Sequence, residues 1–328
     1  MKVLVLGGAG FVGRAVVQRL LDTEGFNPVV ASRRPGQRAG LEAMVVNALD
    51  VTALTRACES VDAVINCVAG DVNTIIAGSR SLVNALRKSS SRPIVVHMST
   101  MSVYGSQEGL VNEATTLVDD IGWYGSAKIC AEQEFESLAR SGGRVFILRP
   151  GCVYGPDSSS WTDRIGRLLK ARRLGDLGPA GDGWSNLVHV ADIAKACLCC
   201  LQGEQLPGQA RIFNLSAPDS PRWNQYFHDF AMEIGATPFR YLTHGELLLR
   251  SKLMAPPLKV LERVCQKLRV DASWLPDSIP PSLLGLWGQQ IKLSSSLLST
   301  AYNFQWTPYQ VGLNASCASF QSGNLASV

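Results

Sequence analysis

The sequence lacks any apolar run long enough to cross a bilayer or to form the core of a signal peptide. Its only apolar N-terminal stretch, Val3 to Leu6, leads directly into glycines. We therefore expect a cytoplasmic protein with no membrane partner. Runs of basic residues are also missing: none exceeds a pair such as Arg172-Arg173, and the formal net charge is only +4. This charge pattern argues against a nucleic-acid partner.

A metal-binding pattern is lacking as well, although the chain holds nine cysteines. Cys197, Cys199 and Cys200 crowd together, but no histidine lies nearby in the sequence and their spacing matches no zinc motif. An odd number of cysteines in apolar surroundings favours buried free thiols. No metal site is expected.

What the chain does contain is enough apolar sequence for a large core, since 46% of its 328 residues are hydrophobic. Its first half alternates short β-rich runs with helical patterns, which is typical of parallel βαβ units. The expected strands are Lys2 to Leu6, Val29 to Ser32, Met44 to Asn47, Ala63 to Cys67, Pro93 to Ser99 and Arg144 to Arg149. The expected helices are Gly13 to Leu21, Asp50 to Glu59, Ile75 to Lys88 and Tyr124 to Arg140. The pattern predicts an α/β fold, a Rossmann-like doubly wound parallel sheet with a smaller C-terminal substrate-binding lobe.

The pattern loosens after Pro150. We assign residues 1–155 to an NADP-binding Rossmann domain whose sheet is completed by roughly 185–216, and 156–328 mainly to an interleaved substrate lobe. Further helices are expected at Trp161 to Arg173, Val190 to Gln202 and Arg222 to Gly235. Residues 242–291 go to the substrate lobe by elimination, and the serine-rich tail after Leu313 is a candidate for disorder.

A glycine-rich motif, Gly7-Gly8-Ala9-Gly10-Phe11-Val12-Gly13, follows the first expected strand and opens a helix. Gly7 permits a tight turn, Gly10 lets the backbone approach a pyrophosphate, and Gly13 lets the helix pack on the strand. The helix N-terminus then offers free N–H groups to the phosphates. Gly7, Gly10, Phe11, Val12 and Gly13 are therefore predicted to bind a dinucleotide.

The second strand ends in Ser32-Arg33-Arg34, where an NAD site would place a carboxylate for the ribose 2′-hydroxyl. Guanidinium groups instead pair with a 2′-phosphate through charge-assisted hydrogen bonds. We therefore predict NADP(H) as the cofactor, with NAD(H) the less favoured choice.

Tyr124 and Lys128 stand four residues apart at the start of an expected helix, so their side chains share one face. A phenol is a poor acid or base at neutral pH unless nearby positive charge, from Lys128 and an oxidised nicotinamide, lowers its pKa. Thr100 follows the fifth strand, at the sheet edge where open α/β sheets bind ligands. These three residues form the predicted catalytic set.

The order of the motifs resembles the extended short-chain dehydrogenase/reductase superfamily over about the first 200 residues. The chain presents the glycine motif, Asn66-Cys-Val-Ala69, Ser99-Thr100, Tyr124-x-x-x-Lys128, Arg149-Pro150-Gly-Cys-Val153-Tyr154-Gly155-Pro156 and Leu187-Val-His189-Val-Ala-Asp192. This resemblance implies that Thr100 donates a hydroxyl hydrogen bond, Tyr124 is the acid/base and Lys128 binds ribose.

The same resemblance places other cofactor contacts by position. Asp50 and Val51 would flank the adenine, Val68 and Ala69 would lie along the cofactor, and Pro150 with Val153 would border the nicotinamide. Relatives commonly dimerise through the two long helices, so a homodimer is the analogous expectation. Asp192 resembles a helix-capping carboxylate.

Nucleotide-sugar epimerases and dehydratases of this superfamily usually have asparagine in place of Cys152 and an arginine shortly before the His189 motif. The turn Asp182-Gly183 leading to His189 is similar instead to the 3β-hydroxysteroid dehydrogenase and dihydroflavonol reductase branch, whose members act on hydrophobic ketones or alcohols. Candidate substrate-binding residues are Met101, Ser102, Cys152, Trp161, Trp184 and His189.

We therefore expect hydride transfer between NADP(H) and a ketone or secondary alcohol of a small, fairly hydrophobic metabolite. Two alternatives stay open. One is a nucleotide-sugar epimerase or dehydratase that keeps its NAD(P) bound. The other is a non-catalytic NADP(H)-binding regulatory protein, which typically has lost the tyrosine or lysine that this chain retains.

Overall fold

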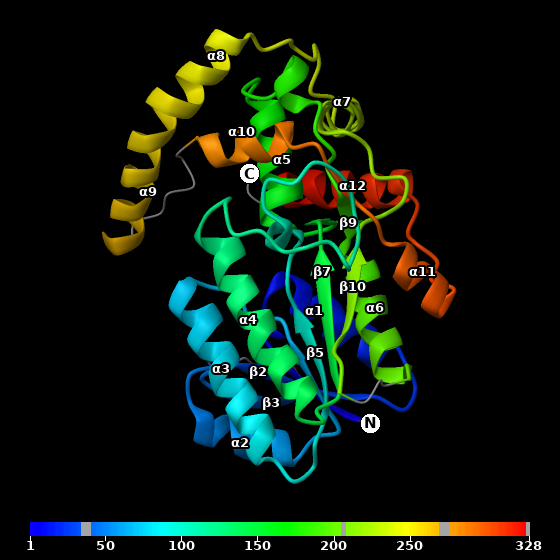
Figure 1. Ribbon diagram of the computed structural model, residues 1–328. Coiled ribbons are helices and arrows are strands. Elements are labelled where there is room, and N and C mark those ends of the chain that lie inside the picture. The colour runs from blue at the N-terminus through cyan, green and yellow to red at the C-terminus, as the bar shows by residue number, and fades with distance from the viewer. Residues whose placement is uncertain (34–40, 205–207, 269–275, 326–328) are drawn as a thin grey trace. The chain divides into compact units, whose positions relative to one another are not determined.

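The computed structural model describes residues 1–33, 41–204, 208–268 and 276–325 (Figure 1). Arg34, one of the predicted cofactor contacts, lies outside the described residues. The chain forms two compact units. Unit 1 comprises Met1–Gly151, Val188–Pro218 and Leu293–Thr307, and unit 2 comprises Cys152–Leu187, Asp219–Lys292 and Pro308–Val328.

Unit 1 is built around a seven-stranded sheet with the order β10-β7-β5-β4-β1-β2-β3. Its neighbouring strands run parallel. The strands are β1 (Lys2–Leu6), β2 (Asn27–Ser32), β3 (Glu42–Val45), β4 (Ala63–Asn66), β5 (Ile94–Met98), β7 (Val145–Pro150) and β10 (Arg211–Leu215). The central strands are near-continuous runs of buried Val, Ile and Leu because helices cover both faces of a parallel sheet. The predicted Rossmann-like fold is confirmed.

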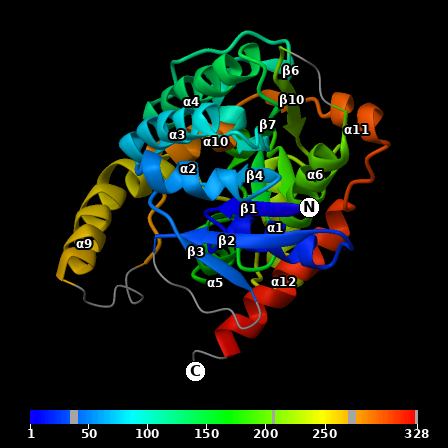
Figure 2. The ribbon, with the colours of Figure 1, turned by 90° about the horizontal axis from the view of Figure 1, so that it is seen from below.

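The helices of unit 1 lie in two layers. Helices α2 (Val51–Glu59), α3 (Val72–Lys88) and α4 (Trp123–Arg140) pack on one face and bury a shared apolar core. Helices α1 (Phe11–Leu21) and α6 (Val190–Gln202) pack against each other on the other face (Figure 2). A short 3₁₀ helix η1 (Met101–Tyr104), strand β6 (Gly109–Val111) and helix α11 (Ser296–Tyr302) complete the unit. The carboxyl ends of β1, β4 and β5 therefore lie side by side, which is where a parallel sheet gathers ligand-binding loops.

Unit 2 is mainly helical and has an aromatic core. Trp223, Tyr226, Phe227 and Phe230 of α7 (Trp223–Glu233) are buried, and the rings of Trp223 and Phe227 pack against Trp287 in tilted and edge-on contacts. Its other elements are β8 (Cys152–Tyr154), π-helix η2 (Ser159–Asp163), α5 (Arg164–Lys170), 3₁₀ helix η3 (Gly178–Gly181), α8 (His244–Leu248), π-helix η4 (Leu249–Met254), α9 (Ala255–Leu268), α10 (Pro281–Gly288) and α12 (Tyr309–Leu325). The sequence boundaries between the two units fall within strands β9 (Leu187–His189) and β11 (Ile291–Leu293).

One expectation about the C-terminal half is wrong. The serine-rich tail is helical as α12, because Leu313, Cys317 and Phe320 recur at helical spacing and are buried. The helical segment expected near Trp161 to Arg173 is present as π-helix η2 followed by α5, and it ends at Lys170. In the parts of the chain that the structure describes, no helix has the length and apolar character needed to cross a membrane.

Candidate active site

The glycine motif forms a tight turn between β1 and α1. Gly7 has a φ of +74°, and a Cβ on Gly13 would lie 2.2 Å from the Gly7 carbonyl oxygen, so neither position accepts a side chain without a backbone shift. Helix α1 begins after Gly10, which provides no side-chain cap for the first N–H groups. A turn that excludes side chains and leaves a helix N-terminus uncapped fits the pyrophosphate of a dinucleotide. Phe11 and Val12, the first helical residues, are half-buried.

The predicted adenosine contacts lie at neighbouring strand ends of the same unit. Ser32 ends β2, and Arg33 follows it with an exposed side chain. Asp50 caps α2 by accepting a hydrogen bond from the Ala53 N–H at 3.0 Å, and Val51 is the first residue of that helix. The carboxylate of Asp50 thus has a structural role in addition to the predicted position beside an adenine.

The loop after β4 carries Val68, which is half-buried, and Ala69, which is exposed. The Val68 N–H donates to the Asn66 side-chain oxygen at 3.2 Å, so Asn66 fixes the direction in which the chain leaves the strand. The carbonyl oxygen of Cys67 closes over Gly7. The two loops therefore adjoin, as contacts along one bound cofactor require.

Helix α4 carries Tyr124 and Lys128 on one face, as their spacing predicts. The Lys128 Nζ lies 6.0 Å from the centre of the Tyr124 ring and donates a hydrogen bond to the Met98 carbonyl oxygen at 2.7 Å. Lys128 is buried, whereas 36% of Tyr124 is exposed and its ring packs edge-on against Trp123. The lysine is thus anchored to the end of β5, while the phenol remains accessible.

Thr100 stands directly after β5 and caps η1. Its hydroxyl oxygen accepts a hydrogen bond from the Ser102 N–H at 3.2 Å and donates to the Ser102 hydroxyl at 3.3 Å. Met101 is buried and Ser102 half-buried in η1. Because Lys128 is tied to Met98 at the end of the same strand, Thr100, Tyr124 and Lys128 come from two elements joined by a direct hydrogen bond.

The surroundings shift the pKa values of both α4 residues. Burial lowers the pKa of Lys128 to about 8, although the charges of Cys67 and Glu132 act in the opposite direction. Desolvation raises the pKa of Tyr124. This direction is opposite to the one expected from Lys128, so the surroundings of the phenol do not by themselves lower its pKa. A positively charged nicotinamide would have to supply the remaining stabilisation of the phenolate.

A buried ion pair that the sequence analysis did not single out connects these elements. Arg149 of β7 donates to both carboxylate oxygens of Glu132, with a shortest distance of 2.6 Å, and both side chains are almost fully buried. The Ser99 hydroxyl also donates to Glu132, and Arg149 donates to the Tyr104 hydroxyl at 2.9 Å. The sequence spacing could have placed Glu132 beside Lys128, since it follows Lys128 by four residues on the same helical face.

A second buried polar pair lies beside Lys128. The Asn66 amide nitrogen is 3.2 Å from His97 Nδ1, and His97 stacks on Phe135 with ring centres 4.2 Å apart. Because Asn66 uses its oxygen for the Val68 N–H, its NH₂ group donates and His97 carries its proton on Nε2. Burial and the Lys128 charge lower the pKa of His97 well below its usual range, so the ring is neutral.

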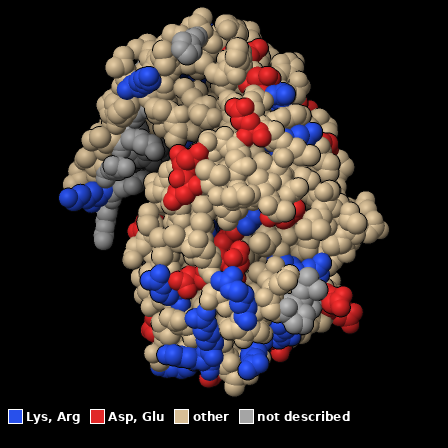
Figure 3. Space-filling model, in the orientation of Figure 1, with Lys and Arg blue, Asp and Glu red and all other residues tan. Residues whose placement is uncertain are grey.

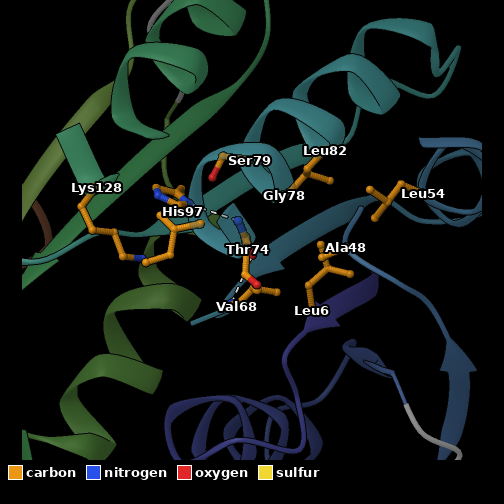
Figure 4. Close-up of a pocket in the computed structure, with 12 residues that line it drawn as sticks. Leu6, Ala48, Leu54, Val68, Thr74, Gly78, Ser79, Leu82, His97 and Lys128 are labelled. Atoms are coloured by element: carbon orange, nitrogen blue, oxygen red, sulfur yellow. Dashed lines mark hydrogen bonds between the residues drawn. The ribbon is translucent and has the colours of Figure 1, made fainter. Parts of the chain in front are cut away.

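These two polar residues line a small cavity within unit 1. Water-sized space in it amounts to about 10 Å³, and its walls come from β1, β4, β5, α2, α3 and α4. In Figure 4 the side chains of His97 and Lys128 lie side by side, away from the apolar wall formed by Leu54 and Leu82. The space is comparable to that of one ordered water molecule.

The remaining candidates near the strand ends are divided between the units. Pro150, in unit 1, ends β7 and is buried. Cys152 and Val153, in unit 2, form part of β8. Burial raises the pKa of the Cys152 thiol far above its usual value, so this cysteine is not a nucleophile at neutral pH.

Two tryptophans of unit 2 have different surroundings. Trp161 packs against Trp223 with ring centres 5.0 Å apart, and its carbonyl oxygen accepts a hydrogen bond from the Tyr226 hydroxyl. Trp184 lies between two cations, with Arg222 4.5 Å and Lys292 4.3 Å from its ring. Trp161 is therefore part of the aromatic core of this unit, whereas Trp184 belongs to a polar cluster.

Helix α6 is capped by a different residue from the one expected. His189 caps the helix through its ring nitrogen, which accepts from the Ala191 N–H at 3.4 Å. Asp192 is not the cap: it lies in the first turn, is buried, and accepts hydrogen bonds from the N–H and hydroxyl of Thr307. The capping role expected for Asp192 is wrong because the residue three positions earlier already satisfies the helix N-terminus.

The geometry can be set against known proteins. The sequence pattern of the NAD dependent epimerase/dehydratase family matches residues 3–216. The chain belongs to this family. The predicted resemblance to the extended short-chain dehydrogenases/reductases is thereby confirmed.

Curated relatives are distant. Over 178 residues the chain is 28% identical to Protein YeeZ of Escherichia coli strain K12, a match covering 54% of this chain and 57% of YeeZ. It is 29% identical to a dTDP-4-dehydro-6-deoxy-D-allose reductase of a Streptomyces species, over 62% of this chain and 74% of that one. It is also 29% identical to a 2-alkyl-3-oxoalkanoate reductase of Stenotrophomonas maltophilia, over 60% and 63%. The chain thus matches only a little over half the length of YeeZ.

Solved structures share the fold along nearly the whole chain. A dTDP-glucose 4,6-dehydratase from Bacillus anthracis in complex with NAD superposes with a TM-score of 0.74 at 16% identity, covering 99% of this chain and 98% of that one. A UDP-glucuronic acid 4-epimerase from Bacillus cereus, in complex with UDP-glucuronic acid and NAD, gives 0.71 at 18% identity, covering 98% and 99%. At these identities the likeness shows the fold.

Proposed function

We propose that the protein is an NADP(H)-dependent oxidoreductase that interconverts a ketone and a secondary alcohol of a small, fairly hydrophobic metabolite. The observation that carries this proposal is the set on α4 and β5: an accessible Tyr124 phenol, a buried Lys128 held by Met98, and the Thr100 hydroxyl at the end of the same strand. This is the arrangement of an acid/base with a nearby cation and a second hydroxyl donor.

Each residue has a distinct task in ketone reduction. A reduced nicotinamide held at the glycine turn would provide the hydride for the carbonyl carbon. Tyr124 gives its phenolic proton to the carbonyl oxygen as the C–O bond becomes single, and Thr100 donates a hydrogen bond to that oxygen. Lys128 stays fixed by Met98 and provides positive charge beside the phenol, which favours the phenolate left after proton transfer. Oxidation of the alcohol follows the same steps in reverse.

A hydrophobic substrate is supported by two observations. Cys152 replaces a polar amide of the sugar-nucleotide enzymes with a buried thiol that remains protonated. One reductase relative takes its name from a 2-alkyl-3-oxoalkanoate, which is a ketone with alkyl chains. Both favour an apolar ketone over a sugar nucleotide.

The proposed preference for NADP(H) rests on Arg33, whose exposed side chain follows β2. An NAD site has at this place a carboxylate that binds the ribose 2′-hydroxyl, whereas a guanidinium pairs with a 2′-phosphate. Arg33→Asp should weaken NADPH binding at least about tenfold and narrow or reverse the preference over NADH, because a carboxylate repels the 2′-phosphate. Titration of protein fluorescence with each cofactor measures this. An unchanged preference for NADPH in the variant contradicts the role of Arg33.

The runner-up function is a nucleotide-sugar epimerase or dehydratase, which the solved structures in complex with NAD favour. An epimerase that recycles its cofactor retains it during purification. A dinucleotide released only on denaturation of the purified protein would support this alternative, whereas freely exchanging NADPH supports the reductase.

Replacement of the phenol tests the proposal itself. Tyr124→Phe should lower kcat for the reduction of medium-chain 3-oxoalkanoates at least about 100-fold, the usual contribution of a positioned acid. The dissociation constant for NADPH should change little, because the hydroxyl is not part of the glycine turn. Tyr241→Phe, at a tyrosine of unit 2 that is 60% exposed, is the matched control and should leave both quantities unchanged. Undiminished turnover in Tyr124→Phe would reject the assignment.

A further inference from the structure

The helical segment formed by η4 and α9, residues 249–268, carries an exposed apolar face. Leu253, Val260, Val264 and Leu268 are 67%, 59%, 45% and 67% exposed, and Leu261 beside them is 39% exposed. Positions 260, 264 and 268 follow each other at intervals of four, so these residues line one side of α9. An apolar side chain on a helix of a globular unit normally faces a core, and these do not.

Little of this segment is packed inside unit 2. Among the elements that the structure describes, α9 contacts chiefly η4, its own N-terminal continuation. Cys265 is buried at one edge of the apolar side. At the start of the segment, the Arg250 guanidinium donates to the Arg173 carbonyl oxygen at 2.7 Å. The segment is therefore fastened to its unit near its beginning and offers the apolar side of α9 to another partner.

The segment is also the basic part of the chain. Residues 249–268 contain Arg250, Lys252, Lys259, Arg263 and Lys267 against a single acid, Glu262, for a net charge of +4. The whole chain has a formal net charge of +4, so the other residues together are neutral. Lys252 and Lys267 are exposed, and Figure 3 shows blue atoms toward both ends of this segment with tan atoms between them.

Within α9 the basic positions lie beside the apolar side. At 100° per residue, positions 259, 263 and 267 fall within one sector of this helix, and positions 260, 264 and 268 fall within the neighbouring sector. A helix with an apolar face, cationic positions next to it and few acids is the kind that lies in the plane of a bilayer interface. Anionic lipid supplies both the apolar layer and the negative charge that such a helix needs.

We propose that residues 249–268 bind the surface of a bilayer containing anionic lipid, with the apolar side of α9 entering the boundary of the acyl chains and the lysines facing the head groups. A second copy of this chain is disfavoured as the occupant, because it would bring another net charge of +4 against the first. The binding is peripheral and involves no spanning helix. It does not depend on the reaction proposed above.

Cosedimentation of the full-length protein with vesicles tests this proposal. Vesicles of phosphatidylcholine mixed with phosphatidylglycerol should carry the protein down, vesicles of phosphatidylcholine alone should carry down much less, and added salt should weaken the binding. Val260→Ser combined with Val264→Ser should reduce the partition coefficient between vesicle and water at least about tenfold. The variant loses the favourable transfer of two half-exposed valine side chains from water into the bilayer. Lys252→Glu combined with Lys267→Glu should reduce it by at least a similar factor.

Matched controls separate this effect from damage to the fold. Val311→Ser removes an apolar side chain of α12 that is 57% exposed, and it should leave vesicle binding unchanged. All variants should keep the thermal midpoint and the NADPH affinity of the parent, because the changed side chains are on the surface. Failure of the parent protein to bind the anionic vesicles overturns the proposal, and so does an equal loss in Val311→Ser. Concentration-dependent dimerisation that disappears in the Val260 and Val264 variant would assign the face to a second copy and would also overturn it.

Discussion

The buried ammonium group of Lys128 should make the protein more stable as the pH rises above neutrality. Only 2% of this lysine is exposed, and burial lowers its pKa from 10.5 to about 8 in the folded protein. A pKa difference of this size means that folding disfavours the charged form by about 3 kcal/mol. Between pH 8 and 10.5 the unfolded chain binds more protons at this site than the folded chain, so stability increases with pH over this range.

The perturbation that isolates this effect is Lys128→Met, which keeps the length of the side chain and removes the charge. The Met98 carbonyl oxygen loses its hydrogen bond in the variant, and that loss does not depend on pH. Urea unfolding of the two proteins should therefore give a difference in free energy, parent minus variant, that rises by roughly 2–3 kcal/mol from pH 7 to pH 10. Burial raises the pKa of the neighbouring Cys67 to about 12, so this thiol stays protonated in the folded state over most of the range.

Lys88→Met, at an exposed lysine near the end of α3, is the matched control. Its free-energy difference from the parent should be flat across the same pH range. A flat difference for Lys128→Met as well would refute the reasoning, because it would mean that the ammonium group is as well stabilised in the folded protein as in water.

Two further outcomes follow from the site. Gly13→Ala should weaken NADPH binding at least about tenfold, because its Cβ would lie 2.2 Å from the Gly7 carbonyl oxygen and the turn must shift; Gly245→Ala, which meets no atom within 4 Å, should leave the affinity unchanged in the same fluorescence titration. Glu132→Gln should cost about 3–5 kcal/mol in urea unfolding because it leaves Arg149 charged and buried, and the double variant with Arg149→Met should cost clearly less than the sum of the two single changes.

Local patterns were sufficient to predict the parallel sheet and the position of helix α4. The ends of β1 and α6 agree with the expectation because apolar runs and the residues that flank them determine such elements locally. Tyr124 and Lys128 could be paired from a spacing of four within one helix. Their link to β5 through Met98 could not, since it depends on a main-chain oxygen that a sequence pattern does not mark.

The features that the sequence did not predict depend on long-range polar contacts or lie in segments whose apolar residues show little periodicity. Asp192 was expected to cap its own helix, yet it holds Thr307, 115 residues away in the chain. The pKa of Tyr124 moves upward because of desolvation, which depends on the tertiary packing around the phenol and is not marked by a sequence pattern. The tail after Leu313 is helical because apolar side chains recur at helical spacing among its small and serine residues. Those apolar side chains are buried in unit 2.

Measuring the pKa of the Tyr124 phenol with and without NADP⁺ tests whether this phenol faces the nicotinamide. The measurement needs no substrate. Ultraviolet absorbance of tyrosinate is recorded across a pH titration for the parent protein and for Tyr124→Phe, and the difference between them isolates this phenol. NADP⁺ should lower the pKa of Tyr124 in the parent, because the charged nicotinamide favours the phenolate, and this change should be missing in Tyr124→Phe. Identical titrations of the parent protein with and without saturating NADP⁺ would show that the phenol does not face the nicotinamide, and would contradict the mechanism.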